Sequence, residues 1–325
     1  MASITQRGPF QFQATVRRKG YKSRTCTFEN FHDAKEWAKG IEANMHRGYY
    51  QDDRLARTTT LDACLARYAT DVTPEKKGVS QELSKINVLR RHPIAKLNMA
   101  EVRSVDVANY IKDRRASVSG GTVARELCVL SKLFRHARHN WGFDGLENPC
   151  QNIDRPSPGK PRKGRISEED LNKLCLHSGS PVLATALRLA VECAMRRGEL
   201  VAMEWKHVNL EEQTVYLPDT KNGDDRTVPL SLAAVELLRG LSRDSTDGRV
   251  FSVRADAITR AMSRACKRAG LSDVRFHDSR REGTARLVKT LGNALEVSAV
   301  TGHKDWRTLR NYYQPDAREL AKRLG

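Results

Sequence analysis

A proline- and glycine-rich segment near the middle of the chain most restricts how the chain can fold. Residues 152–165 contain three prolines and two glycines. Because proline fixes φ and has no backbone N–H, this segment can form neither a helix nor a central strand. It predicts an interdomain linker that divides the chain into two parts. At 325 residues the chain is long enough for two or three domains, each with its own core.

The first 50 residues predict a small sheet covered by one helix. Apolar and polar residues alternate from position 10 to position 16, as in a strand with one buried face. Residues 19–20 predict a hairpin turn, and residues 21–28 predict the returning strand. Residues 33–36 match a capping box, and apolar residues at helical spacing follow. The inward strand residues are Phe10, Phe12, Ala14 and Val16, and the helix stripe is Ala34, Trp37, Ala38, Ile41 and Met45.

A polar linker over residues 51–59 and then a unit of four helices are predicted next. Helical periodicity marks residues 60–70, 80–92, 104–118 and 121–140, separated by prolines or glycines. The last of these carries one apolar stripe, formed by Val123, Leu127, Leu130, Phe134 and Ala137.

The part after the central segment predicts mostly helices with one small sheet. Residues 167–170 cap a helix, and residues 181–193 form an apolar helix. Strands are predicted at residues 214–217 and 226–229, joined through a turn that contains Asn-Gly. Further helices are predicted at about residues 231–242, 255–269, 279–291, 294–301, 305–312 and 316–324. The fold class is therefore multidomain and mainly α, with small β-sheets: an α+β N-terminal domain, a helical domain, and a mixed α/β, mostly α, C-terminal domain.

Composition indicates the class of partner. The formal charge is +18 and the pI is near 9.8, which favours nucleic acid first and an anionic membrane surface second. We expect neither a signal peptide nor a membrane span, because no stretch is apolar enough. The seven cysteines are odd in number and lack a Cys-x-x-Cys pair. This favours reduced thiols in a cytosol over a zinc site or a disulfide framework.

Basic residues occur in each predicted domain and are candidates for contacts with phosphate. The alternative for each group is an ordinary solvated surface, on a hairpin, on a helix face or in a linker. The candidates are Arg17, Arg18, Lys19, Lys22 and Arg24 in the hairpin, Arg125 and Lys132 off the apolar stripe, and Lys160, Arg162 and Lys163 in the central segment.

Three short motifs in the last half of the chain carry residues suited to phosphodiester chemistry. They are Arg196-Arg-Gly-Glu199, then His277-Asp-Ser-Arg280, then Gly302-His303 followed by Tyr312-Tyr313. Guanidinium forks match the geometry of phosphate oxygens, and a phenolate can attack phosphorus once its proton is removed.

In their order and spacing these motifs resemble the tyrosine recombinase (phage integrase) family, whose pattern reads Arg, Lys, His-x-x-Arg, Gly-His, Tyr. The resemblance covers roughly the last half of the chain. It implies that Arg196 and Arg280 bind the scissile phosphate and that Glu199 orients Arg196 or a neighbouring histidine. It further implies Lys221 as general acid, His277 as proton relay, His303 as a hydrogen-bond partner of the phosphate, and Tyr312, nine residues after His303, as nucleophile.

The same resemblance implies the reaction and the organisation of the protein. Family members cut and rejoin DNA through a 3′-phosphotyrosine and a Holliday junction, as homotetramers, with chemistry like that of type IB topoisomerases and without metal or cofactor. The implied domains are an arm-type DNA-binding domain (1–50), a helical core-binding domain (58–150) and a catalytic domain (165–325). This order of domains best fits an integrase of a phage or mobile element. Such an integrase would act on core and arm sites of double-stranded DNA in a bacterial cytosol, with an accessory DNA-bending protein.

Other functions remain open. Within the family, the alternatives are a shufflon-type DNA invertase and a Xer-like resolvase. Outside it, they are a DNA-binding regulator without catalysis and a metal-dependent nuclease that uses His277, Asp278 and His303. The sequence also departs from the family pattern: Cys193-Ala194 replaces a frequent Thr-Gly, and Thr301 replaces a common leucine. A second arginine, Arg281, follows Arg280, and the His-x-x-Arg spacing favours Arg280 as the phosphate-binding residue.

Overall fold

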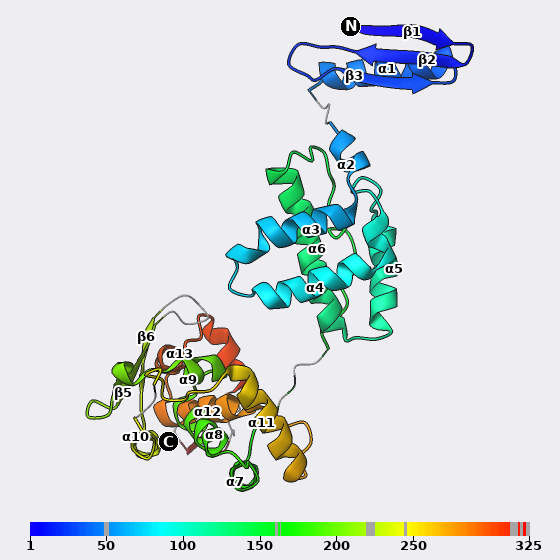
Figure 1. Cartoon of the computed structure of the whole chain (residues 1–325). Coiled ribbons are helices and arrows are strands. Elements are labelled where there is room, and N and C mark those ends of the chain that lie inside the picture. Colours follow the sequence, from blue (N-terminus) through cyan, green and yellow to red (C-terminus); the bar gives the residue numbers. More distant parts are fainter. Residues whose placement is uncertain are drawn as a thin grey trace. The chain divides into compact units, whose positions relative to one another are not determined.

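The computed structural model divides the chain into two compact units, residues 1–161 and 162–325 (Figure 1). It describes residues 1–48, 52–159, 162, 164–218, 225–243, 246–312, 318 and 321–322, without the side chains of 306 and 311. The boundary between the units falls inside the proline-rich segment, where residues 154–159 form neither helix nor strand.

The N-terminal part of the first unit is a three-stranded antiparallel sheet with one helix packed on it. The elements are β1 (Ala2–Gly8), β2 (Gln11–Val16), β3 (Arg24–Phe28) and α1 (Phe31–His46). A small core of Ala14, Val16, Ala34, Ala38 and Met45 lies between sheet and helix. The alternation in β2 and the stripe on α1 were therefore predicted correctly.

Three details of this part differ from the prediction. The strand β1 was not predicted, because most of its residues are exposed and it has no apolar alternation. Phe10 lies in the turn between β1 and β2 and is 81% exposed, so it is not part of the buried face. The cap of α1 is Asn30, whose side chain accepts a hydrogen bond from the backbone N–H of Asp33 at 2.8 Å, and not a capping box at residues 33–36.

The rest of the first unit is helical and has a separate core. Its elements are α2 (Arg54–Thr58), α3 (Leu61–Asp71), η1 (Thr73–Glu75), α4 (Val79–Arg91), η2 (Pro93–Lys96), α5 (Ser104–Arg115) and α6 (Gly120–Asn140). All five residues of the predicted stripe on α6 are buried in this core. The predicted linker is partly wrong, because residues 54–58 form the short helix α2, in which Ala56 is buried.

The second unit is built around one apolar helix, α8 (Pro181–Cys193). The other elements are α7 (Glu168–Leu176), α9 (Arg197–Ala202), η3 (Trp205–His207), β4 (Val208–Asn209), β5 (Thr214–Leu217), β6 (Arg226–Pro229), α10 (Leu232–Arg239), α11 (Ala255–Arg268), α12 (Phe276–Leu291), α13 (Ala294–Thr301) and η4 (Trp306–Asn311). Helices α7, α10 and α12 pack against α8, and β4, β5 and β6 form an antiparallel sheet in that order.

Most elements of this unit match the sequence prediction, including the bounds of α8, β5 and β6. The prediction missed β4 and α9. It also began α12 three residues late, and residues 306–311 form a 3₁₀-helix. The predicted Asn-Gly turn and most of the predicted helix at residues 316–324 lie outside the described residues.

The described helices include none that is both long and apolar enough to span a bilayer. All seven cysteines are free thiols.

Candidate active site

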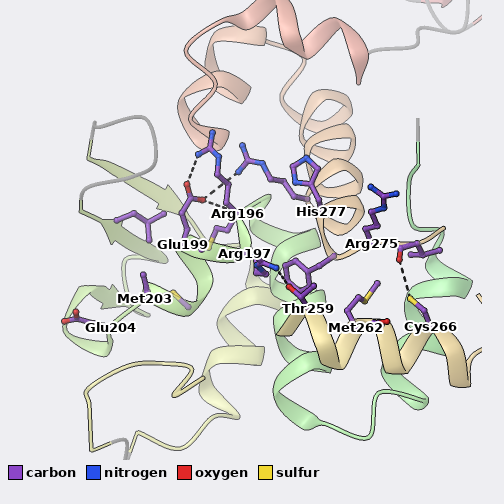
Figure 2. Close-up of a pocket in the computed structure, with 18 of the residues that line it drawn as sticks. Arg196, Arg197, Glu199, Met203, Glu204, Thr259, Met262, Cys266, Arg275 and His277 are labelled. Atoms are coloured by element: carbon purple, nitrogen blue, oxygen red, sulfur yellow. Dashed lines mark hydrogen bonds and ion pairs between the residues drawn. The ribbon is translucent and has the colours of Figure 1, made fainter. Parts of the chain in front are cut away.

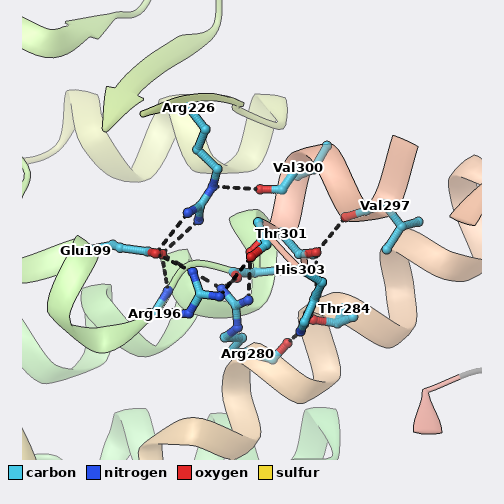
Figure 3. A network of polar contacts seen from close by, with 11 residues as sticks. Arg196, Glu199, Arg226, Arg280, Thr284, Val297, Val300, Thr301 and His303 are labelled. Atoms are coloured by element: carbon cyan, nitrogen blue, oxygen red, sulfur yellow. Dashed lines mark hydrogen bonds and ion pairs between the residues drawn. The ribbon is translucent and has the colours of Figure 1, made fainter. Parts of the chain in front are cut away.

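Five of the six predicted catalytic residues gather in the second unit, and Figures 2 and 3 label four of them, Arg196, His277, Arg280 and His303. Each lies at or near a helix start or a helix end, where the backbone exposes its polar groups. The sixth, Lys221, lies outside the described residues. The five are Arg196 at the start of α9, His277 in the first turn of α12 and Arg280 just after that turn, His303 just after α13, and Tyr312 just after η4.

A sharp turn between α8 and α9 places Arg196. Ala194 follows the last residue of α8 and has φ 50° and ψ 30°, a left-handed conformation that costs a residue with a Cβ roughly 1–2 kcal/mol. Arg196 then caps α9, and its backbone N–H donates to the Glu199 carboxylate at 2.7 Å. Ala194 stands where the family frequently has the glycine of Thr-Gly. A glycine would adopt this backbone conformation without strain.

Three successive carbonyls at the end of α13 each accept a hydrogen bond from a different arginine (Figure 3). Arg226 Nε donates to the carbonyl of residue 300 at 3.2 Å, and Arg280 Nη2 to that of residue 301 at 2.7 Å. Arg196 Nη2 donates to the carbonyl of residue 302 at 3.0 Å. The last carbonyls of a helix lack partners within the helix and carry partial negative charge, so cations are favourable there.

The carboxylate of Glu199 holds the same three arginines from the other side. It accepts from Arg196 Nη1 at 2.7 Å and from both terminal nitrogens of Arg226 at 2.9 and 2.8 Å, and it lies 3.8 Å from Arg280 Nη1. Burial by itself would raise the pKa of Glu199, but the hydrogen bonds from Arg226 and Arg196 hold that pKa at about 2. Three cations around one carboxylate leave an excess of two positive charges at this place.

Arg280 is deeply buried within the cluster and is only 2% exposed. Its Nη1 also donates to the carbonyl of Ala194 at 2.6 Å. Burial and the neighbouring Arg196 lower the pKa of Arg280 to about 10, so that it stays charged at neutral pH. A guanidinium has five N–H donors, and the contacts described for Arg196 and Arg280 use only some of them.

Arg281 points elsewhere. Its Nη1 donates to the backbone carbonyl of Arg162, and the Arg162 side chain pairs with Asp278. The structure therefore brings Arg280 into the arginine cluster and directs Arg281 toward the segment that precedes α7, in agreement with the His-x-x-Arg spacing.

Both histidines favour the neutral form. Partial burial and the cations Arg280 and Arg281 lower the pKa of His277, although its side chain reaches solvent. Burial, Arg280, Arg196 and Arg226 lower the pKa of His303 to about 4. The ring of Tyr312 lies beside His303, with 5.9 Å between the ring centroids.

Arg226 is a member of the site that the sequence motifs did not identify. Its side chain is 10% exposed and forms a fork with Glu199, which is 7% exposed. A Cβ on Gly302 would lie 2.8 Å from Arg226 Nη1, so the turn before His303 rests directly on this guanidinium. One signal was present: Arg226 occupies the same face of its predicted strand as the buried Val228, and a charge on an inward face requires a partner.

We expect Arg226→Gln to lower the free energy of unfolding by about 3 kcal/mol, because it breaks a buried ion pair. DNA affinity should change little, since the side chain is almost enclosed. Thermal unfolding compared with Thr227→Ala, an exposed neighbour on the same strand, measures the effect. Equal stability of the two variants would contradict a structural role for the Arg226–Glu199 fork.

A cavity of about 1240 Å³ adjoins the cluster (Figure 2). It is lined by residues of α9, α11 and the start of α12, among them Arg197, Met262 and Arg275. Across the described ranges, no group of three or more His, Cys, Asp or Glu side chains is arranged to hold a metal ion.

The basic residues predicted to contact phosphate fall into two groups. Arg17, Lys19, Lys22, Arg125 and Lys132 are exposed, and Arg18 is half-buried. Two others make internal ion pairs: Arg24 with Asp52 at 2.8 Å and Asp53 at 3.2 Å, and Arg162 with Asp278. Lys160 and Lys163 lie outside the described residues.

Comparison with known proteins gives consistent results. Residues 165–319 match the family model described as the phage integrase family. A putative integrase/recombinase of Haemophilus influenzae is 34% identical over 284 residues, which cover 84% of this chain and 93% of the relative. A shufflon-specific DNA recombinase of Escherichia coli is 35% identical over 280 residues, covering 82% and 72%. The structure of a lambda integrase dimer bound to a COC′ core site aligns with a TM-score of 0.67 at 20% identity, covering 97% of this chain and 95% of that chain.

Proposed function

This chain belongs to the phage integrase family of tyrosine recombinases, and we propose that it is a site-specific integrase in which Tyr312 attacks the scissile phosphate. The family's enzymes cleave and rejoin DNA, so the reaction class follows from membership. The observation that best supports the placement of the reaction is the cluster of Arg196, Arg226 and Arg280 around Glu199, next to His303 and Tyr312.

Arg196 and Arg280 are proposed to hold the phosphate. Attack by the tyrosine spreads negative charge over the equatorial oxygens, and donors fixed in advance stabilise that charge most. Both terminal nitrogens of each guanidinium already donate, to backbone carbonyls and, for Arg196, to Glu199, which fixes the direction of the group. The N–H groups that remain are proposed to donate to the phosphate. The leaving 5′-oxygen takes a proton from Lys221, and His277, neutral at pH 7, relays the proton of the phenol.

We propose three functional domains: an arm-type DNA-binding domain (1–50), a core-binding domain (58–150) and the catalytic domain (165–325). Separate hydrophobic cores for the small sheet, the helical unit and the C-terminal unit support this division. A structure of lambda integrase residues 75–356 covers 77% of this chain, against 97% for the longer chain, which fits an additional N-terminal domain.

The proposed partners are double-stranded DNA and further copies of the chain. A related structure is titled as a lambda integrase tetramer bound to a Holliday junction, and a homotetramer exchanging strands through such a junction is proposed here. An accessory DNA-bending protein would connect arm and core sites. The proposed setting is the bacterial cytosol, with a phage or mobile element as the source of the gene. The similarity to a shufflon-specific recombinase supports inversion as the second candidate function.

Accumulation of a covalent adduct tests the proposed reaction. Duplexes taken from the borders of the encoding element, nicked so that the cleaved fragment diffuses away, should trap protein on the 3′ end in the presence of EDTA. Absence of an adduct with intact binding would indicate a regulator without catalysis, and cleavage that requires magnesium would indicate a nuclease.

DNA affinity should depend steeply on salt, because the charge of +18 favours phosphate contacts. Each neutralised phosphate contributes about −0.9 to the slope of log affinity against log salt. Fluorescence anisotropy between low and physiological salt measures the slope, and a flat response would contradict a phosphate-dominated interface.

Removal of residues 1–50 should leave cleavage of a core duplex largely intact and weaken binding to flanking arm duplexes. The reason is that the small sheet and α1 have their own core, with exposed Arg17, Lys19 and Lys22. Gel-shift assays on core and arm duplexes separate the two effects. A truncated protein that folds but no longer cleaves the core duplex would refute the assignment of a separate arm-binding domain.

A further inference from the structure

We propose that Thr301 fixes the tautomer of His303, so that the neutral ring carries its proton on Nδ1 and presents an unprotonated Nε2 to Tyr312. Thr301 is thus a positioning residue for the proposed nucleophile, and this role rests on the proposed function. The tautomer itself is a property of the protein without DNA and can be tested separately.

The assignment follows from where the single proton of the Thr301 hydroxyl goes. Thr301 Oγ1 lies 2.6 Å from the carbonyl oxygen of Val297, one turn earlier in α13. A carbonyl only accepts, so the hydroxyl must donate in this contact. The same Oγ1 lies 2.6 Å from His303 Nδ1 (Figure 3). Because its proton is already committed, the hydroxyl accepts here, and Nδ1 must carry the hydrogen.

The surroundings hold this geometry in place. Thr301 is fully buried at the last position of α13, where Gly302 ends the helix in the left-handed conformation. The backbone N–H of His303 donates to the Ser298 carbonyl at 3.2 Å, and the Ser298 hydroxyl donates to the His303 carbonyl. His303 is therefore held on both its backbone and its ring, and Thr301 has no freedom to turn its hydroxyl toward solvent.

The charges that face His303 keep its ring neutral. They are Arg196 and Glu199 from α9, Arg226 from β6, and His277 and Arg280 from α12, with Tyr312 following η4. Burial and the three guanidinium groups lower the pKa of His303 to about 4. At neutral pH the ring therefore has one N–H group, and this group donates its hydrogen bond to Thr301 Oγ1.

The consequence is that Nε2 of the neutral ring can accept but cannot donate. A phosphate oxygen offers no hydrogen, whereas the phenol of Tyr312 does. Of these two groups, only the phenol has a hydrogen that Nε2 can accept, and its ring lies beside His303 with 5.9 Å between the ring centroids. This differs from the role that family resemblance assigns to His303, and it comes from a threonine where the family commonly has leucine, a side chain that cannot hydrogen-bond.

Nuclear magnetic resonance of the ¹⁵N-histidine-labelled full chain tests the tautomer directly. Long-range proton–nitrogen correlations at pH 7 distinguish a ring protonated on Nδ1 from one protonated on Nε2. The nine histidines require assignment, which a His303→Asn variant supplies. We expect the Nδ1–H pattern for His303 in the parent and in Thr301→Ser. In the isosteric Thr301→Val, which lacks the hydroxyl, we expect a shift toward the Nε2–H form.

Single-turnover adduct formation on the nicked duplex gives the functional readout. Thr301→Val should slow adduct formation by roughly ten-fold at pH 7, and Thr301→Ser should restore the parent rate. If the role of Thr301 were purely structural, Thr301→Val would lower the unfolding temperature without changing the tautomer of His303. An Nε2–H pattern in the parent overturns the proposal, even if Thr301→Val fails to fold. The same tautomer in parent and Thr301→Val also overturns it. An Nδ1–H pattern without any adduct in the parent would support the tautomer and count against the proposed recombinase site instead.

Discussion

Tyr312→Phe is expected to abolish the covalent protein–DNA adduct while leaving DNA affinity nearly unchanged. Phenylalanine keeps the ring beside His303 but lacks the oxygen that would bond to phosphorus. Because no other step can replace a missing nucleophile, the expected loss is complete. Denaturing gel analysis after incubation with a nicked duplex measures the adduct, and a gel-shift assay on the same duplex measures binding.

The adjacent tyrosine provides the matched control. Tyr313 lies outside the described residues, whereas the ring of Tyr312 lies next to His303. Tyr313→Phe should therefore still form the adduct. A phosphotyrosyl peptide that maps to position 313 would reverse the assignment.

Arg280→Ala is expected to slow strand cleavage by roughly 10²–10³-fold, equivalent to about 3–4 kcal/mol of transition-state stabilisation. The Arg280 guanidinium is held by the carbonyls of Ala194 and Thr301, which fixes its direction before DNA arrives. DNA affinity should stay close to that of the parent, because one buried contact contributes little to a large basic interface.

Arg281→Ala is the matched control for this effect. Arg281 is the next residue on α12, but it donates to the carbonyl of Arg162 rather than to any group of the cluster. We expect a much smaller change in cleavage rate than for Arg280→Ala, measured as single-turnover adduct formation. Thermal unfolding of both variants separates catalytic loss from instability. A larger catalytic defect in Arg281→Ala would move the phosphate contact by one residue.

Elements whose sequence pattern agrees with their burial were predicted well. Helix α8 has apolar residues on nearly every side and is buried, and the stripe on α6 faces the core. The elements that were missed depend on other parts of the chain. The strand β1 is held by pairing to β2 and not by its own apolar residues, and α9 has six residues, too few to show a helical period.

The candidate site, too, could be predicted from the sequence only in part. The ordered motifs located Arg196, His277, Arg280, His303 and Tyr312 in the sequence, and the structure brings these residues together. Their partners could not be predicted, because Arg226 and the carbonyls of α13 belong to no motif. A backbone carbonyl leaves no trace in a sequence, and the capture of three arginines by one helix end depends entirely on how β6, α9 and α12 pack around it.

The end of α13 has a consequence for mutational tolerance and for protein engineering. The acceptors for the three arginines are main-chain oxygens, which every amino acid supplies. Side chains such as that of Val300 can therefore change in a library without removing an acceptor. Gly302 cannot, because its φ of +67° and the nearby Arg226 leave no room for a Cβ. Sequence drift along α13 should be broad at exposed positions such as Glu296 and Ala299 and should stop at this glycine.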